Sequence, residues 1–244
     1  AKKYISIGFE VSLSKNYGEH LGFSDEEYKN LGVAILDNEK DIIESANIII
    51  QLGLPSDEKI SYLKENQNLI GILNPYQNKE KIDSLIKKKV NNFSLELLPR
   101  ITRAQSMDIL SSQANLAGYK AVIESFSHFK KAVPMMMTAA GTVPAAKVLV
   151  VGAGVAGLQA IATAKRMGAI VFATDVRMAS KEQVESLGGK FLTVEGSENL
   201  ETEGGYAKEA SDEFKKKQEE LLTETIKKID IIICTALIPG KKAP

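Results

Sequence analysis

Gly152, Gly154 and Gly157 form the pattern G-x-G-x-x-G. The pattern follows the apolar run Lys147–Val151 and opens the alanine-rich segment Ala156–Met167. A buried strand, a tight glycine turn and a helix in this order are the context in which the pattern indicates dinucleotide binding. Gly152 permits the turn, Gly154 lets the backbone approach a pyrophosphate, and Gly157 lets the helix pack on the sheet. The pyrophosphate is expected at the helix N-terminus, where free N–H groups and the helix dipole attract an anion.

An acidic residue follows the next predicted strand. Asp175 comes directly after Ile170–Thr174, and its carboxylate can accept hydrogen bonds from the hydroxyls of an adenosine ribose. The same charge repels a 2′-phosphate, so it favours NAD(H) over NADP(H). Arg177 lies two residues further on and could accept such a phosphate. Because Asp175 is the better placed of the two groups, we expect NAD(H).

A second polar segment precedes a long helical pattern over Met107–Ala132. Its side chains offer donors and acceptors for a carboxamide, a ribose and a diphosphate; they are Arg100, Arg103, Gln105, Asp108 and Ser111. The segment can equally be a polar interdomain loop in which Ser106 and Asp108 cap helices. The chemistry of the residues alone favours neither interpretation.

No general base stands out in the sequence. Dehydrogenases that act on alcohols or amines must also move a proton, usually with His or Lys. The two histidines, His20 and His128, are better explained as structural or surface residues. Direct hydride transfer between two nicotinamide rings needs no proton acceptor, only two rings held together with water excluded.

Short apolar runs alternate with amphipathic segments, which is typical of an α/β fold with parallel sheets. In the first half, strands are predicted at Gly8–Ser12, Val33–Leu36, Ile48–Leu52, Leu69–Leu73 and Asn92–Leu95, and helices at Ser24–Asn30, Glu39–Ser45, Asp57–Asn66 and Lys79–Lys88. In the second half, strands are predicted at Lys147–Val151, Ile170–Thr174, Phe191–Val194 and Ile229–Cys234, and helices at Ala156–Met167, Ser180–Leu187 and Lys208–Lys228. We expect an N-terminal α/β domain over residues 1–112 and a Rossmann dinucleotide-binding domain over residues 113–244.

Composition narrows the class of protein. Lys plus Arg and Asp plus Glu are 31 each, so the chain has no net charge with which to attract nucleic acid. The single cysteine, Cys234, is expected to be a small buried hydrophobic residue, and the three methionines Met135, Met136 and Met137 are expected to pack in a core. No metal site is predicted.

Several motifs occur in one order along the chain. They are Pro99-Arg100-Ile101-Thr102-Arg103-Ala104-Gln105-Ser106-Met107-Asp108, Thr138-Ala139-Ala140-Gly141, the glycine pattern, Lys181-Glu182-Gln183-Val184, Gly204-Gly205-Tyr206-Ala207-Lys208 and Thr235-Ala236-Leu237-Ile238-Pro239-Gly240. Together they resemble the α subunit, or domain I, of the proton-translocating NAD(P) transhydrogenase family over essentially the whole chain. The resemblance implies two Rossmann-like domains with parallel sheets, with NAD(H) in the interdomain cleft. It also implies a homodimer.

The resemblance further implies a Re/Si-specific, proton-translocating NAD(P)+ transhydrogenase reaction. Hydride would pass between NAD(H) on this chain and NADP(H) on a partner domain, the β subunit, while a membrane domain of the same enzyme forms the proton channel. The chain would then be cytoplasmic and peripheral on the inner side of the cell membrane, held there through its partner subunits.

The resemblance also implies roles for individual residues. Arg100, Gln105, Asp108 and Ser111 should contact the nicotinamide half of NAD(H), and Gln105 should orient the two nucleotides for transfer. Around the rest of the nucleotide, the implied contacts are Val155 at the pyrophosphate, Asp175, Val176 and Arg177 at the adenosine ribose, Gly205 and Tyr206 on a mobile loop that closes over the site, and Thr235, Ala236 and Leu237 along the pocket.

Two other functions stay open. Alanine dehydrogenases have a similar fold but carry a substrate-binding Lys and a catalytic His in the first domain. Here Ile48–Leu54 contains no Lys and Leu69–Lys79 contains no His. A non-catalytic NAD-sensing module would bind NADH without turnover. Relative to the transhydrogenase family, the first strand would lie before Ala1, and further Rossmann strands and a returning helix would follow Pro244.

Overall fold

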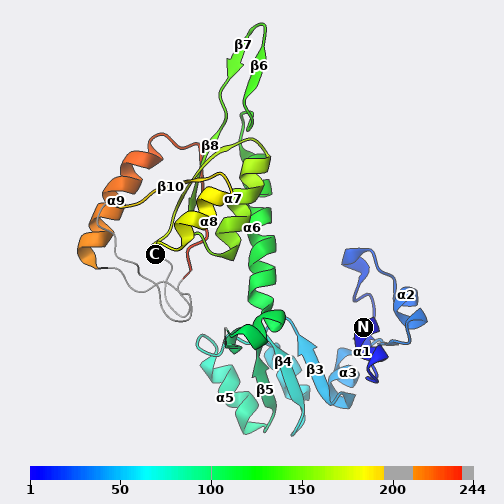
Figure 1. The fold of residues 1–244 in the computed structure, drawn as a ribbon. Coiled ribbons are helices and arrows are strands. Elements are labelled where there is room, and N and C mark those ends of the chain that lie inside the picture. Colours follow the sequence, from blue (N-terminus) through cyan, green and yellow to red (C-terminus); the bar gives the residue numbers. More distant parts are fainter. Residues whose placement is uncertain (100, 195–210, 238–244) are drawn as a thin grey trace. The chain divides into compact units, whose positions relative to one another are not determined.

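The computed structural model describes residues 1–99, 101–194 and 211–237 and divides the chain into two compact units, Ala1–Pro99 and Arg100–Pro244. Each unit has a hydrophobic core of its own. Figure 1 shows the elements of both units. The boundary that we expected after residue 112 falls inside helix α6 (Ile109–His128). This helix packs on α7 (Val155–Arg166) and therefore belongs with the second unit from its first residue.

The first unit is built around a parallel sheet with the strand order β3-β4-β5. Its strands are β3 (Ile48–Gln51), β4 (Asn68–Gly71) and β5 (Asn91–Ser94), its helices are α3 (Glu39–Ser45), α4 (Asp57–Tyr62) and α5 (Lys79–Lys87), and the 3-10 turn η2 (Leu95–Leu97) follows β5. Leu69 on the central strand is fully buried. Each helix contributes one buried apolar side chain to the same core, and these are Ile43, Ile60 and Leu85.

The beginning of the chain forms a separate two-stranded parallel sheet. It contains β1 (Ser12–Ser14) and β2 (Ala34–Leu36), with α1 (Lys2–Ser6), η1 (Glu19–Leu21) and α2 (Asp25–Asn30) around it. The strand predicted at Gly8–Ser12 begins only at Ser12, because Gly8 has a left-handed φ of 95° that ends the turn after α1. Ser24 and Glu27 form a capping box at the start of α2.

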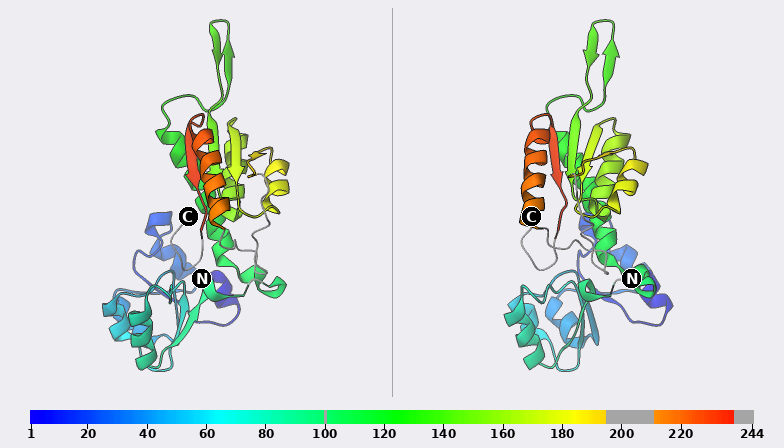
Figure 2. Two further views of the ribbon diagram at one scale, coloured as in Figure 1. Left: turned by 90° about the vertical axis from the view of Figure 1, so that its left-hand side faces the viewer. Right: turned by 60° about the vertical axis from the view of Figure 1, so that its left-hand side comes forward.

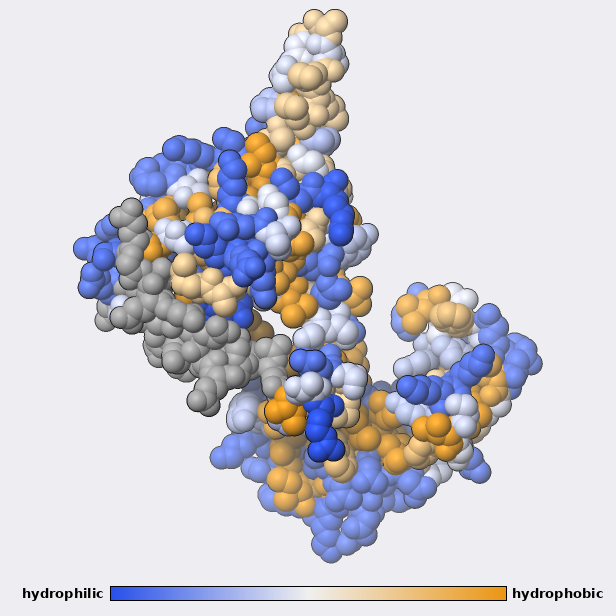
Figure 3. Space-filling model, viewed as in Figure 1, coloured by the Kyte–Doolittle hydropathy of each residue, from blue (hydrophilic) through white to orange (hydrophobic). Residues whose placement is uncertain are grey.

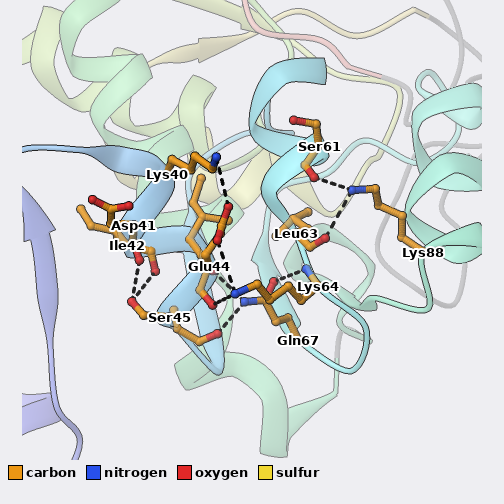
Figure 4. A network of polar contacts seen from close by, with 12 residues as sticks. Lys40, Asp41, Ile42, Glu44, Ser45, Ser61, Leu63, Lys64, Gln67 and Lys88 are labelled. Atoms are coloured by element: carbon orange, nitrogen blue, oxygen red, sulfur yellow. Dashed lines mark hydrogen bonds and ion pairs between the residues drawn. The ribbon is translucent and has the colours of Figure 1, made fainter.

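In the first unit, a network of polar contacts satisfies carbonyl groups at the ends of α3 and α4 (Figure 4). The Gln67 amide donates to the carbonyl oxygens of Ile43 and Ala46 at 2.6 and 2.7 Å, and its own oxygen accepts from the Lys64 N–H at 2.7 Å. The Lys88 ammonium donates to three carbonyl groups at the end of α4 and just beyond it, those of Ile60, Ser61 and Leu63. Both side chains therefore supply the hydrogen bonds that helix ends cannot make internally.

The second unit contains a four-stranded parallel sheet with the order β10-β9-β8-β11. Its strands are β8 (Lys147–Val151), β9 (Ile170–Thr174), β10 (Lys190–Phe191) and β11 (Ile231–Cys234). The helices of this unit besides α6 and α7 are α8 (Ser180–Ser186) and α9 (Asp212–Ile226), and η3 (Thr102–Met107) precedes α6. Figure 2 shows β11 alongside β8, on the side opposite β9. The chain therefore changes direction across the sheet between β8 and β11, as at the switch point of a Rossmann fold.

Helix α6 approaches α7 closely enough for the two backbones to touch. Gly118 is buried in the middle of α6, and a Cβ atom at this position would overlap the carbonyl oxygen of Ala156 in the first turn of α7. Val122 and Phe126 continue the contact into the core of the second unit. Because Gly118 has no side chain, the first turn of α7 can lie directly against the middle of α6.

The methionine triplet does not pack in a core. It lies on an antiparallel hairpin of β6 (Met136–Thr138) and β7 (Gly141–Val143), which stands clear of the parallel sheet (Figure 1). Met135, Met136 and Met137 are 59%, 48% and 73% exposed, so the prediction of core packing was wrong. In the hydropathy view the hairpin carries pale orange, weakly hydrophobic surface (Figure 3). The segment has no hydrophobic period by which a two-stranded ribbon could be distinguished from a buried connector.

Cys234 also differs from expectation. The residue is exposed, because alternate residues of β11 point to opposite faces and only Ile231 and Ile233 face the core. The continuous apolar run at this position predicted a strand buried on both faces, which β11 is not.

Replacing Gln67 by Leu should lower the free energy of unfolding by on the order of 3 kcal/mol, because one buried carbonyl group, one part-buried carbonyl group and one part-buried N–H lose their partner. Urea denaturation followed by circular dichroism measures the change. Gln77 is exposed, so Gln77→Leu is the matched control and should leave stability within about 0.5 kcal/mol of the unaltered protein. Equal stability of the two variants would contradict the role given to Gln67.

Replacing Gly118 by Ala should destabilise the protein by about 1–3 kcal/mol, although Ala is the better helix former, because the added methyl group meets the α7 backbone. Gly53→Ala makes the same chemical change where no atom lies within 4 Å and should have little effect. Thermal unfolding of the two variants side by side gives the comparison. A Gly118→Ala protein that melts as high as the Gly53→Ala protein would exclude the close helix contact.

Candidate nucleotide-binding site

The glycine pattern forms the turn between β8 and α7, as the sequence indicates. Gly152 has a φ of 95°, a conformation that side chains strongly disfavour, and its N–H donates to the Thr174 carbonyl oxygen at 2.8 Å. This bond ties the loop to the end of the neighbouring strand β9. The turn is therefore held in place by the sheet itself.

Gly157 and Thr235 hold the loop from two other directions. A Cβ at Gly157 would overlap the Gly152 carbonyl oxygen, so the first turn of α7 lies directly on the loop. The Thr235 hydroxyl, at the end of β11, donates to the same carbonyl at 2.8 Å. The backbone of Ala236 packs against Gly152, where a Cβ would come within 2.7 Å of its nitrogen. The glycine loop is thus held by the end of β9, by the first turn of α7 and by the residues that follow β11.

Gly154 is the N-cap residue of α7, and among the described residues no side chain caps this helix end. The N–H groups of a first helical turn have no acceptor within the helix, and the helix dipole adds partial positive charge. A Cβ at Gly154 would meet only the Arg177 side chain, at 3.9 Å, so this side of the loop is open to a close approach. The arrangement can bind a phosphate group.

Asp175 follows β9 directly, and its carboxylate turns back onto the glycine loop. Its Oδ2 accepts from the Ala153 N–H at 2.7 Å, and its Oδ1 accepts from the Arg177 N–H at 2.9 Å. Burial raises the pKa of the Asp175 carboxyl, but hydrogen bonds from Arg177 and Ala153 outweigh this effect and leave the pKa below its ordinary value. The group is therefore ionised at neutral pH and can accept hydrogen bonds from ribose hydroxyls.

Arg177 forms a two-pronged ion pair with this carboxylate. Its Nε donates to Asp175 Oδ1 at 2.9 Å and its Nη2 donates to Oδ2 at 3.0 Å. The two side chains are largely buried, with 19% of Arg177 and 7% of Asp175 exposed. The sequence placed these residues near one another but did not indicate that they bind each other.

The remaining residues predicted for this half of the site lie on the same edge of the sheet but differ in exposure. Val155, the first residue of α7, and Leu237, beyond β11, are exposed, whereas Val176 is half-buried. Ala153, whose N–H binds Asp175, was not predicted, although its place inside the glycine pattern was a usable signal. Arg100, Gly205 and Tyr206 lie outside the described residues.

The residues predicted for the nicotinamide form a second cluster, at the start of α6. Asp108 is the N-cap residue of this helix; its Oδ1 accepts from the Ser111 N–H at 3.0 Å and its Oδ2 from the Ser111 hydroxyl at 2.7 Å. Gln105 and Ser106 lie within η3, and both are exposed. The capping role left open for Asp108 is therefore present, while Ser106 does not cap α6. An Asp–Ser pair at a helix start can still present hydroxyl and carboxylate oxygens to a ligand.

Other kinds of site find no support in the part of the chain that the structure describes. There, no three His, Cys, Asp or Glu side chains are grouped so that they could hold a metal ion. His128 ends α6, with its Nδ1 at 2.9 Å from the Glu124 carbonyl oxygen, and His20 is exposed in η1. None of the described helices is both long and apolar enough to span a bilayer.

Comparison with known proteins identifies the family. Residues 1–117 match the model of the N-terminal domain of alanine dehydrogenase/PNT, and residues 121–244 match the model of its C-terminal domain. The chain is similar to an NAD(P) transhydrogenase subunit alpha protein of Rickettsia prowazekii, with 51% identity over 98% of this chain and 64% of the relative. The solved structure of a transhydrogenase from Sinorhizobium meliloti superposes with a TM-score of 0.85 at 47% identity, over 100% of this chain and 65% of that one. The chain thus spans a little less than two thirds of the length of these proteins.

Alanine dehydrogenases are more distant relatives. The enzyme of Methanococcus maripaludis is 25% identical over 99% of this chain and 60% of its own length. The similarity to the transhydrogenase subunit and the similarity to the alanine dehydrogenase both cover the two units of the fold and the glycine loop between β8 and α7. The chain accordingly belongs to the alanine dehydrogenase/PNT family, and the Rickettsia transhydrogenase subunit is about twice as identical to it as the alanine dehydrogenase is.

Proposed function

We propose that this chain is the NAD(H)-binding component of a proton-translocating transhydrogenase, which transfers hydride between NAD(H) bound here and NADP(H) bound on a partner domain. The reaction assignment is carried by the similarity to transhydrogenase α subunits along the whole chain. The nucleotide assignment is carried by the geometry of one sheet edge.

The adenosine half of NAD(H) fits the carboxyl edge of the second sheet. The start of α7 offers N–H groups to the diphosphate, and Gly154 leaves room for it. The ionised Asp175 lies one strand away and offers its oxygens to the ribose hydroxyls. We assign Val155, Val176, Arg177, Ala236 and Leu237 to the walls around these groups.

The nicotinamide half fits the start of α6. Gly118, where α6 touches the first turn of α7, is separated from Asp108 by roughly 15 Å of helix at about 1.5 Å per residue. The residues between them extend beyond the start of α7, so Asp108, Ser111 and Gln105 stand within the reach of an extended dinucleotide. We assign Gln105 to orient the nicotinamide, and Asp108 with Ser111 to hold its ribose or carboxamide.

The reaction needs little chemistry from the protein. Hydride passes from the reduced nicotinamide ring to the oxidised one, and the positive charge moves to the ring that donated it, so no side chain must take up a proton. The protein has to hold two rings at contact distance and exclude water. The same proposal assigns Arg100 to contact the nicotinamide half. It assigns Gly205 and Tyr206 to a loop over the nucleotide.

Because a proton-translocating transhydrogenase must couple this step to a membrane, the proposal includes partners. The name of the Rickettsia relative calls it a subunit, which indicates that it works with other chains. For this chain we propose a homodimer, an NADP(H)-binding β subunit and a membrane proton-channel domain, with the chain on the cytoplasmic face of the membrane. Hydride transfer would be Re/Si-specific.

An alanine dehydrogenase is the competing function. Such enzymes are expected to carry a Lys in the segment Ile48–Leu54 and a His in the segment Leu69–Lys79, and this chain has neither. A His is the usual general base of such a reaction at neutral pH. The test of function therefore offers both sets of substrates.

Alanine replacements at two glycines should separate binding from folding. Gly154→Ala should weaken NADH binding by roughly tenfold or more, equivalent to about 1.4 kcal/mol, without loss of stability, since its Cβ would crowd the nucleotide but no tightly packed protein atom. Gly157→Ala should lower stability by about 1–3 kcal/mol, since its Cβ meets the Gly152 carbonyl. NADH fluorescence titration and thermal unfolding measure the two effects. Unchanged NADH affinity in a folded Gly154→Ala protein would show that the diphosphate does not bind at this loop.

Hydride exchange tests the reaction itself. The full-length protein is mixed with an NADP(H)-binding partner domain, and reduction of an NAD analogue by NADPH is followed; in parallel, the protein is offered NADH, pyruvate and ammonium. Exchange without consumption of NADH by pyruvate is the expected result. A Gln105→Asn variant should bind NADH normally and transfer hydride at least about tenfold more slowly, because the rings are misaligned. Gln113→Asn, an exposed change on α6, is the control and should transfer normally.

Oxidation of NADH by pyruvate and ammonium would instead assign an alanine dehydrogenase. Binding of NADH without either reaction would indicate that the protein is an NAD-sensing module.

A further inference from the structure

Four hydrogen bonds already occupy the Asp175 carboxylate. Two come from backbone N–H groups, those of Ala153 and Arg177, and two from the Arg177 guanidinium. An ionised carboxylate has about four lone-pair positions for hydrogen bonds. The group is therefore saturated before any nucleotide is present.

The backbone bonds and the guanidinium bonds differ in what they allow. The Ala153 and Arg177 N–H groups belong to the loop and to the chain after β9, and they hold the carboxylate in place at this edge of the sheet. The guanidinium reaches the carboxylate through a side chain, so it can change its position without a movement of the backbone. Ribose hydroxyls that donate to Asp175 must take the two positions that Nε and Nη2 of Arg177 now hold.

The guanidinium also lies beside the glycine loop. Its Nη2 is 3.9 Å from the point where a Cβ of Gly154 would lie. A cation at this place is next to the region where the ribose and the diphosphate of a bound nucleotide would meet. Once moved off Asp175, it remains tethered two residues away and stays within reach of the ribose 2′ position.

We propose that Arg177 is an internal counter-ion that the adenosine ribose displaces from Asp175, and that this ion pair sets the choice between NAD(H) and NADP(H). The inference rests on the proposed function, because it assumes that the adenosine half of a dinucleotide binds at this edge. With Asp175 charged, the carboxylate takes the 2′-hydroxyl and repels a 2′-phosphate. With a neutral side chain at position 175, the Arg177 guanidinium is released from that charge and binds a 2′-phosphate in two-pronged fashion. The site thus contains a latent 2′-phosphate receptor.

Adenosine 5′-monophosphate and adenosine 2′,5′-bisphosphate are the probes, because they differ only in the 2′-phosphate and test the adenosine half without hydride transfer. Their affinities for the full-length protein are measured by calorimetry or by displacement of NADH fluorescence. The unaltered protein should prefer the monophosphate. Asp175→Asn, which keeps the size of the side chain, should prefer the bisphosphate by roughly tenfold or more, the effect of a charge-assisted hydrogen bond. Thermal unfolding verifies that each variant is folded.

The double variant Asp175→Asn/Arg177→Gln is the decisive comparison. It should lose the preference for the bisphosphate, and Arg177→Gln alone should reject the bisphosphate more strongly than the unaltered protein does. Survival of the bisphosphate preference in the double variant would assign the phosphate to another group and overturn the proposal. So would an Asp175→Asn protein that binds the monophosphate but still rejects the bisphosphate. If the unaltered protein bound neither NADH nor the monophosphate, the nucleotide site itself would be refuted, and this inference with it.

Discussion

The second unit depends on how closely α7 can approach its neighbours. Two glycines remove the side chains that would keep it away: Gly157 on the side of the β8 loop and Gly118 on the side of α6. On one side a helix backbone meets a loop backbone, and on the other it meets a second helix. The start of α7 is therefore fixed by steric contact between main chains rather than by side chains that could repack. A diphosphate site at a helix N-terminus gains from this, because its donors cannot move away from the ligand.

The polar groups at the sheet edge follow from the same constraint. With the loop fixed, the Gly152 carbonyl and the Ala153 N–H point in set directions, and residues from other strands satisfy them. Thr235 donates to the carbonyl and Asp175 accepts from the N–H. Each of these residues comes from a different strand end. The ends of β8, β9 and β11 are consequently joined by hydrogen bonds through the glycine loop.

Much of this organisation could be predicted from the sequence. The strands β8 and β9 have the predicted bounds, and α3 does as well, because a short apolar run or a capped amphipathic turn specifies each locally. The glycine pattern and Asp175 were found because their spacing carries their chemistry. The pairing of Arg177 with Asp175 could not be found, since two neighbouring charges in a loop can face each other or face solvent with the same sequence.

The errors have physical causes too. The methionines were assigned to a core because apolar side chains usually lie there, but a two-stranded ribbon has no second layer in which to bury them. Cys234 was assigned to a core because a run of isoleucines hides the alternation of a strand that is covered on one face. In both cases the missing information was which neighbours the fold supplies to the segment.

The strand order also has a consequence for how the protein is made. Thr235 and Gly152, which bond across the switch point, are 83 residues apart in the chain. During synthesis β8, β9 and β10 leave the ribosome well before β11, so one edge of β8 stays unpaired until most of the unit has been translated. Closing such a long loop is slow compared with forming local helices. A nascent chain therefore cannot form the hydrogen bond between the Thr235 hydroxyl and the glycine loop until β11 has been synthesised.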